Sequence, residues 1–173
     1  PTISCNSSLP GSVAFGYKKY LYLQCGSSYS KMHHGKGTIE YVSMPDDYYL
    51  SNLDSIEFQG SYYLFGNRNG ASLYAYKADS NSDLFTAYTD LPQINVTYNR
   101  LNVFSLNSDL YLTTGKRFYR SSDAKHWKNL HKFQDYPDQS GKLGNNLYTI
   151  FENHKKNTFY YSIDRGITWK RLK

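Results

Sequence analysis

The residue types that carry most enzyme chemistry are sparse in this chain. Glutamate occurs only as Glu40, Glu57 and Glu152, and the first two lie in strand-like patterns. A glycoside hydrolase needs two carboxyl groups that flank the scissile bond, and no such pair can be named from the spacing. No Gly-x-Ser-x-Gly elbow and no glycine-rich phosphate loop occurs. The sequence therefore predicts no catalytic residue, and we expect a protein that is not an enzyme.

Metal ligation has equally little support. His33 and His34 are adjacent in a polar segment, and neighbouring histidines do not complete a tetrahedral site. Cys5 and Cys25 have no histidine at ligand spacing. A disulfide between them would stabilise the fold by about 3 kcal/mol, and two buried thiols are the alternative. We expect no metal and no cofactor, and the disulfide predicts a periplasmic or secreted protein.

Charge excludes several classes of partner. The 173 residues include 20 Lys and Arg against 14 Asp and Glu, and the net charge of +6 is spread without a basic run. No zinc-finger spacing or basic helix occurs, so we expect no nucleic-acid partner. No apolar stretch is long enough for a transmembrane helix, so we expect no membrane span. The chain begins at Pro1, which we interpret as a mature or trimmed chain.

The elements that must position any site are strands, because the chain has 19 Tyr and 9 Phe but only 2 Met. An apolar residue is followed five positions later by Tyr, across a polar turn, four times. Each occurrence predicts a β-hairpin. The four pairs are Phe15 and Tyr20, Phe58 and Tyr63, Leu106 and Tyr111, and Leu143 and Tyr148.

A third strand is predicted after each hairpin, at 38–42, 73–76, 117–120 and 158–161. In the last two units a polar turn leads to a fourth strand that carries Trp127 or Trp169. Four strands in about 40–45 residues is the period of a propeller blade. We predict an all-β fold: a small propeller-like array of about four degenerate four-stranded antiparallel blades. The units span approximately 13–44, 54–88, 102–130 and 140–172 of a single domain, after an N-terminal segment 1–12.

One turn matches a known motif. The pattern S-x-D-x-G-x-T-W at Ser162–Trp169 resembles the Asp-box, or bacterial neuraminidase repeat, and Ser121–Trp127 resembles a degenerate copy. The resemblance implies a structural turn in which Asp accepts backbone N–H bonds, Gly takes the turn and Trp packs on the sheet. The residues expected in these roles are Ser121, Asp123, Trp127, Ser162, Asp164, Gly166, Thr168 and Trp169.

The same resemblance suggests that the chain could be a sialidase, but its residues do not support that activity. Sialidases of this kind have six blades and roughly twice this length, and they bind the substrate carboxylate with three arginines. An Arg-Ile-Pro-like motif is absent here, and no Tyr–Glu nucleophile pair can be singled out. We therefore expect no sialidase activity.

Binding is expected on one face of the array. In a blade, the second-to-third loop and the link to the next blade share a face. Here that face holds the long segments 26–37, 44–53, 89–100 and 131–140. Long loops on a rigid scaffold commonly carry binding residues. The candidate partner-binding residues are Tyr29, His33, His34, Tyr48, Tyr49, Tyr98, Arg100, Asp135 and Tyr136.

These observations favour a binding function. The leading hypothesis is an inhibitor or immunity-type protein that blocks a toxin, effector or cell-wall hydrolase with these loops. The alternative is a lectin-like module that binds glycans, and a glycoside hydrolase is a third option. A lectin built from repeats should carry the same aromatic and polar set in every blade. The loops differ in length and content, which favours a single protein partner.

Overall fold

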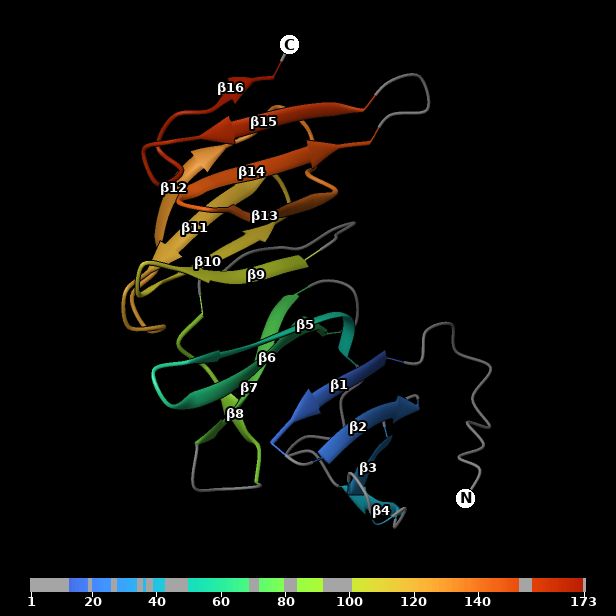
Figure 1. Ribbon diagram of the computed structural model, residues 1–173. Helices are drawn as coiled ribbons and strands as arrows, with labels where there is room; N and C mark the ends of the chain where they lie inside the picture. The colour runs from blue at the N-terminus through green and yellow to red at the C-terminus, as the bar shows by residue number, and fades with distance from the viewer. Residues whose placement is uncertain are drawn as a thin grey trace.

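A computed structural model describes residues 13–18, 20–25, 28–33, 36, 39–42, 50–68, 72–79, 84–91, 101–152 and 157–172. Within these ranges every regular element is a β-strand, and the strands form four antiparallel sheets of four strands each (Figure 1). We number the sheets 1 to 4 in chain order. The predicted fold class, an all-β propeller-like array of four-stranded antiparallel blades, is confirmed.

Sheets 1 and 2 occupy the N-terminal half of the chain. Sheet 1 contains β1 (Val13–Tyr17), β2 (Tyr20–Cys25), β3 (Ser28–His33) and β4 (Ile39–Val42). Sheet 2 contains β5 (Leu50–Phe58), β6 (Ser61–Arg68), β7 (Ser72–Asp79) and β8 (Thr86–Tyr88).

Sheets 3 and 4 follow the same order. Sheet 3 contains β9 (Leu101–Leu106), β10 (Asp109–Thr114), β11 (Arg117–Ser121) and β12 (Lys128–Lys132). Sheet 4 contains β13 (Gln139–Leu143), β14 (Asn146–Phe151), β15 (Thr158–Ser162) and β16 (Lys170–Arg171). In every sheet each strand pairs with the next one along the chain.

The first strands of sheets 2, 3 and 4 lie next to one another. β9 contacts β5 on one side and β13 on the other, whereas the last strands β8, β12 and β16 lie at the outer edges (Figure 1). Sheets 2, 3 and 4 therefore stack face to face around their first strands, as blades do, and sheet 1 packs on sheet 2 through the core that contains Tyr22 and Leu64. In sheet 3 the turn between β10 and β11 and the link to sheet 4 lie on one face of this array, where Phe133 N–H donates to Lys116 O.

Apolar cores fill the spaces between the sheets. Alternate residues of a strand point to opposite faces, so Leu64 packs toward sheet 1 while Phe65 packs toward sheet 3. Tyr111 and Phe118 pack against Leu147 between sheets 3 and 4. Burying a side chain of this size contributes about 1.5–3 kcal/mol. No single sheet could bury both of its faces, so the stack itself provides the core.

The tyrosine register predicted from the repeat is present. The hairpin tyrosines Tyr20, Tyr63, Tyr111 and Tyr148 all lie in the second strand of their sheets. Tyr63 and Tyr111 are buried between sheets.

Sheet 1 differs from the expectation. Segment 26–37 was expected as a loop, and the third strand was expected at 38–42. Instead β3 occupies Ser28–His33, and Ile39–Val42 is the fourth strand. The strand is hard to recognise because Ser30, Lys31 and His33 interrupt its apolar residues. It pairs fully with β2 all the same.

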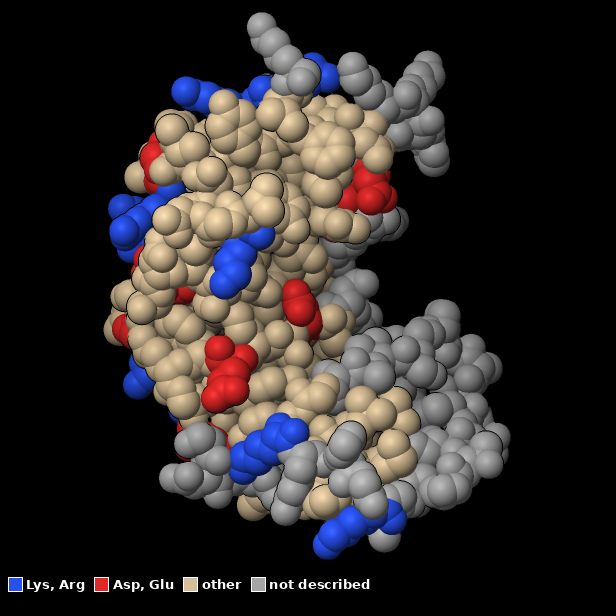
Figure 2. All heavy atoms as spheres, in the orientation of Figure 1, with Lys and Arg blue, Asp and Glu red and all other residues tan. Residues whose placement is uncertain are grey.

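The predicted disulfide is not tested by the structure. Cys5 lies outside the described residues, and only the backbone of Cys25 at the end of β2 is described, so the disulfide stays a prediction. Within the described ranges no helix is long and apolar enough to cross a membrane. On the face that Figure 2 shows, the described basic and acidic side chains alternate in small groups without forming a continuous basic surface.

Candidate functional site

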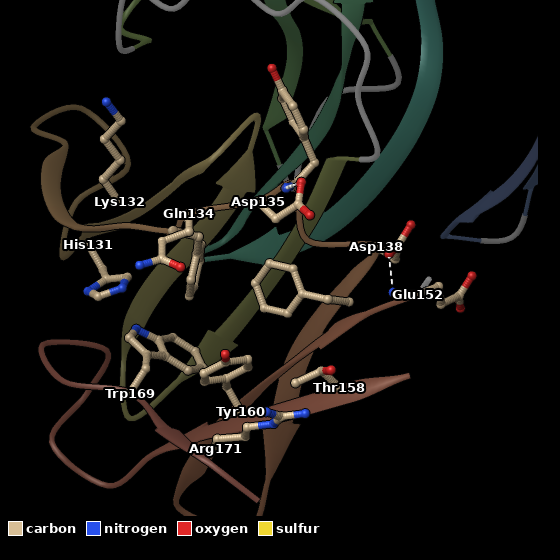
Figure 3. A pocket seen from close by; sticks show the side chains of 13 residues that line it. His131, Lys132, Gln134, Asp135, Asp138, Glu152, Thr158, Tyr160, Trp169 and Arg171 are labelled. Atoms are coloured by element: carbon tan, nitrogen blue, oxygen red, sulfur yellow. Dashed lines mark hydrogen bonds between the residues drawn. The ribbon is translucent and has the colours of Figure 1, made fainter. Parts of the chain in front are cut away.

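A pocket lies between the outer parts of sheets 3 and 4. It has a volume of about 810 Å³ and lies where the link from β12 to β13 meets the end of β14 and the start of β15 (Figure 3). This is the face of the array on which the sequence predicts binding. Its lining residues are His131, Lys132, Phe133, Gln134, Asp135, Tyr136, Asp138, Phe151, Glu152, Thr158, Tyr160, Trp169 and Arg171.

Aromatic side chains form one wall of the pocket. Phe133 is nearly fully buried, and its ring centroid lies 5.2 Å from Trp169, 5.4 Å from Phe151 and 4.8 Å from His131. Phe151 in turn lies 5.4 Å from Tyr160. Most of these contacts are edge-to-face, the arrangement that aromatic quadrupoles favour. Because each ring braces its neighbour, the wall is preorganised.

The link between sheets 3 and 4 is tied down at both ends. Phe133 donates its backbone N–H to Lys116 O at 2.7 Å, and the Lys116 ammonium donates to Gln134 O at 2.7 Å. The same ammonium lies 4.6 Å from the ring centroid of Tyr136. At the far end, Asp138 donates its N–H to Ile150 O at 2.8 Å. The β10–β11 turn and β14 thus hold the loop that lines the pocket.

Acidic and basic groups share the pocket. In the view of Figure 3, Asp138 and Glu152 lie at one end, and His131 and Lys132 lie at the other. The Asp138 carboxylate accepts the backbone N–H of Glu152. Carboxylate oxygens accept hydrogen bonds and cationic groups donate them, so the pocket can satisfy a ligand that carries many hydroxyl groups.

Burial sets the protonation state of His131. Desolvation lowers the pKa of its imidazole below the usual 6.5, and a hydrogen bond with the backbone of Ile167 opposes this only in part. His131 is therefore neutral at neutral pH, with one ring nitrogen as donor and one as acceptor.

The turn Ser162–Trp169 is built around one carboxylate. Asp164 accepts from Ser162 Oγ at 2.7 Å, from the Thr168 backbone N–H at 2.9 Å and from Thr168 Oγ1 at 2.6 Å. The two bonds from Thr168 are the main reason that the pKa of Asp164 falls to about 2. Trp169 Nε1 donates to Gly166 O at 3.1 Å. This bond places the indole ring in the pocket wall.

The turn Ser121–Trp127 repeats the arrangement. Asp123 accepts the backbone N–H groups of Lys125 and His126 at 2.9 and 2.8 Å and contacts the His126 ring, and these bonds hold the pKa of its carboxyl well below the usual range. Trp127 Nε1 donates to Ala124 O at 3.0 Å. Ala124 (φ 61°) and Gly166 (φ 89°) occupy matching left-handed positions three residues before Trp. The Asp123 and Asp164 carboxylates therefore both accept hydrogen bonds within their own turns.

A second repeated contact links the first strands and was missed in the sequence. Asp54 Oδ2 in β5 accepts the Val103 N–H of β9 at 2.7 Å, and Asn102 Oδ1 in β9 accepts the Ser140 N–H of β13 at 2.6 Å. Asp54 and Asn102 each precede their hairpin anchor residue by four positions. A polar residue four positions before each hairpin anchor was therefore the sequence pattern from which this contact could have been predicted.

The four predicted partner-binding residues that the structure describes do not form one group. Asp135 and Tyr136 both line the pocket, and Tyr136 is 45% exposed. His33 ends β3 and packs edge-on against Tyr20 with centroids 5.3 Å apart. Five predicted residues lie outside the described ones: His34, Tyr48, Tyr49, Tyr98 and Arg100.

Tyr29 requires a correction. It was expected to be exposed in a loop, but it lies in β3 and is only 1% exposed, inside the core between sheets 1 and 2. The displaced third strand explains the error, because Tyr29 pairs with Gln24 and points toward sheet 2. A side chain in that position cannot bind a partner.

Metal ligands do not gather in the part of the chain that the structure describes. No group of three His, Cys, Asp or Glu side chains there could hold a metal ion.

The fold resembles that of solved proteins. No protein-family model matches the chain, and no curated protein matches it in sequence. The structure of YjhT is similar, with a TM-score of 0.60 and 10% identity over 94% of this chain and 64% of that one. The GH43 β-1,3-galactosidase has a TM-score of 0.55 and 10% identity over 92% and 44% of the two chains. The N-terminal domain of Nup159 has a TM-score of 0.52 and 9% identity over 96% and 49%.

These comparisons correct the prediction that the chain is not an enzyme. The prediction depended on the absence of a recognisable catalytic pattern in the sequence. A GH43 galactosidase has a similar fold at 10% identity. The lack of a recognisable catalytic motif in this sequence therefore does not argue against catalysis. At this identity the comparison shows the propeller-like fold alone, and the chain spans less than two thirds of these structures.

Proposed function

We propose that the chain is a carbohydrate-binding propeller protein and that a saccharide occupies the pocket between sheets 3 and 4. One observation carries the proposal: a braced aromatic wall faces the same pocket as carboxylate, amide and cationic groups. A sugar ring has an apolar C–H face and a rim of hydroxyl groups. The wall offers a surface for the first, and Asp135, Gln134 and Arg171 offer partners for the second.

The sequence favours a protein inhibitor or immunity-type protein, and that function gains no support from the pocket or from the fold comparisons. Of its four described candidate residues only Asp135 and Tyr136 line the pocket, and Tyr29 is buried. The Asp-box assignment of Ser121–Trp127 and Ser162–Trp169 belongs to the present proposal, supported by the bonding of Asp123 and Asp164. The turn Ser162–Trp169 positions Trp169 in the wall, and the Asp123 and Asp164 carboxylates have a structural role.

A glycan array followed by calorimetric titration tests saccharide binding. The array should include β-1,3-linked galactosides, because a GH43 β-1,3-galactosidase has a similar fold. Arg171 lines the pocket and pairs with Tyr160, whereas the neighbouring Lys170 pairs with Tyr161 outside it. We expect R171A to weaken binding about tenfold, or about 1.4 kcal/mol. K170A removes the same charge and should leave binding unchanged; equal effects of both variants would contradict the pocket.

Glycoside hydrolysis is the second candidate function. Asp138 and Glu152 lie at the same end of the pocket in Figure 3, and paired carboxyl groups are what most glycosidases use. Release of reducing sugar from the saccharides bound on the array tests this directly. Activity that is lost in E152Q while binding persists would assign catalysis to this pair. Binding without turnover in the wild type would exclude it.

A further inference from the structure

Among the described residues, exposed apolar side chains occur at both ends of the stack. Eight large hydrophobic side chains of the described residues are exposed, and five of them lie in sheet 4, in the turn between its last strands or directly after β16. A concentration of this kind marks an interaction surface. The five are Leu143, Phe159, Ile163, Ile167 and Leu172.

Strand alternation shows which way the sheet 4 residues point. Leu147 packs into the core toward sheet 3, so its neighbour Tyr148 points away from sheet 3. Ile150 points the same way, opposite Phe159, which is 43% exposed. Tyr148 is the counterpart of Tyr111 in the repeat, and Tyr111 is fully buried against the next sheet. Sheet 4 therefore presents the same kind of face that sheets 2 and 3 bury.

At the other end, one exposed leucine lies on the complementary face. Tyr22 packs toward sheet 2, so its neighbour Leu21 points away from the stack. Leu21 is 37% exposed, whereas its repeat counterparts Leu64 and Leu112 are fully buried against the preceding sheet. The chain thus carries both halves of its own sheet-to-sheet interface, one at each end.

The first strand of sheet 4 continues the second repeated contact. Gln139 occupies the position of Asp54 and Asn102, four residues before the hairpin anchor. Asp54 and Asn102 each bond to the next first strand. Gln139 is exposed on β13 and carries an amide at the same place.

We propose that sheet 4 of one molecule packs against sheet 1 of a second copy of this chain, head to tail. The second copy is the occupant because it supplies the Leu21 face that matches the Phe159 face, in the pattern that the internal interfaces already use. Such a heterologous contact closes into a ring if the rotation between copies allows it and otherwise builds an open chain. The proposal is independent of saccharide binding.

Light scattering coupled to size exclusion tests the assembly. The wild type should elute as a dimer or larger species, and L21D and F159D should each be monomeric, because a buried charge without a partner is strongly unfavourable. L84D is the control, since Leu84 is exposed by 77% outside both faces, and it should assemble like the wild type. Circular dichroism confirms that each variant is folded.

Mixing the two variants tests the head-to-tail geometry. L21D keeps an intact sheet 4 face and F159D keeps an intact sheet 1 face, so an equimolar mixture should form a dimer through one interface. A monomeric wild type overturns the proposal. So does an L21D variant that still dimerises alone, because that result would show sheet 4 pairing with itself.

Discussion

At the scale of single residues, the two polar turns depend on a left-handed residue that also packs between sheets. Gly166 has φ 89°, and a Cβ built on it would lie 2.5 Å from Phe118 Cε1 in sheet 3. Ala124 occupies the matching position and is fully buried. The turn therefore sets both the direction of the last strand and the fit of sheet 4 against sheet 3.

We expect G166A to destabilise the protein by about 2–4 kcal/mol, from the left-handed backbone and the overpacking together. Gly60 is the matched control, because it has φ 73° and its Cβ would meet nothing within 4 Å. G60A should cost only the backbone part, about 1–2 kcal/mol. Urea unfolding measures both, and equal losses would show that the Phe118 contact is unimportant.

Buried tyrosine hydroxyls differ in their hydrogen bonding. The hydroxyl of Tyr111 has no hydrogen-bond partner in the structure, whereas that of Tyr88 donates to Ala124 O. An unpaired buried polar group is costly, and a paired one stabilises by about 1 kcal/mol. We expect Y111F to be neutral or stabilising and Y88F to lose about 1 kcal/mol. Thermal unfolding checks this, and a larger loss for Y111F than for Y88F would contradict it.

At the scale of elements, side chains of the first strands join one sheet to the next. Burial raises the pKa of the Asp54 carboxyl above 3.8, although the N–H groups of Val103 and Ser55 oppose the shift. Asn102 makes the equivalent contact without a charge. Because the pKa of Asp54 is higher in the folded state, the protonated carboxyl stabilises the fold at low pH. This contribution to the free energy of unfolding is lost as pH rises from 3.8 through the folded-state pKa.

The stability of D54N relative to the wild type should therefore rise between pH 3.8 and neutral pH, because only the wild type then carries a partly buried carboxylate at this position. N102D makes the reverse change, and we expect it to be destabilised at neutral pH but not in acid. Urea midpoints at the two pH values provide the measurement. A D54N protein whose stability relative to the wild type does not rise with pH would contradict the role of burial.

At the scale of the whole molecule, the repeat could be predicted because its signals are local. The five-residue step to Tyr20, Tyr63, Tyr111 and Tyr148 is set by a hairpin and a strand, and both leave a pattern in neighbouring residues. The third strand of sheet 1 could not be predicted, since its alternation is hidden by polar residues. Tyr29 was misplaced for that reason.

The pocket was beyond prediction for a different physical reason. Phe133, Phe151 and Trp169 come from different strands and loops of two sheets, and they meet only because sheet 4 stacks on sheet 3. Asp135 and Tyr136 were named as candidates because they lie in a long loop, and both line the pocket. Which loops share a face follows from strand order, whereas which side chains meet follows from the stacking.

Intrinsic fluorescence gives the most direct test of saccharide binding in this pocket. Trp169 lines the pocket and Trp127 does not, so a folded W127F variant has one indole, located at the site. Titration with the saccharides from the array should give a saturable change in emission that is weakened by R171A and unaffected by K170A. If none of these saccharides gives a saturable change up to about 1 mM, saccharide binding in this pocket is contradicted. A Kd of about 1 mM corresponds to a binding free energy of about 4 kcal/mol.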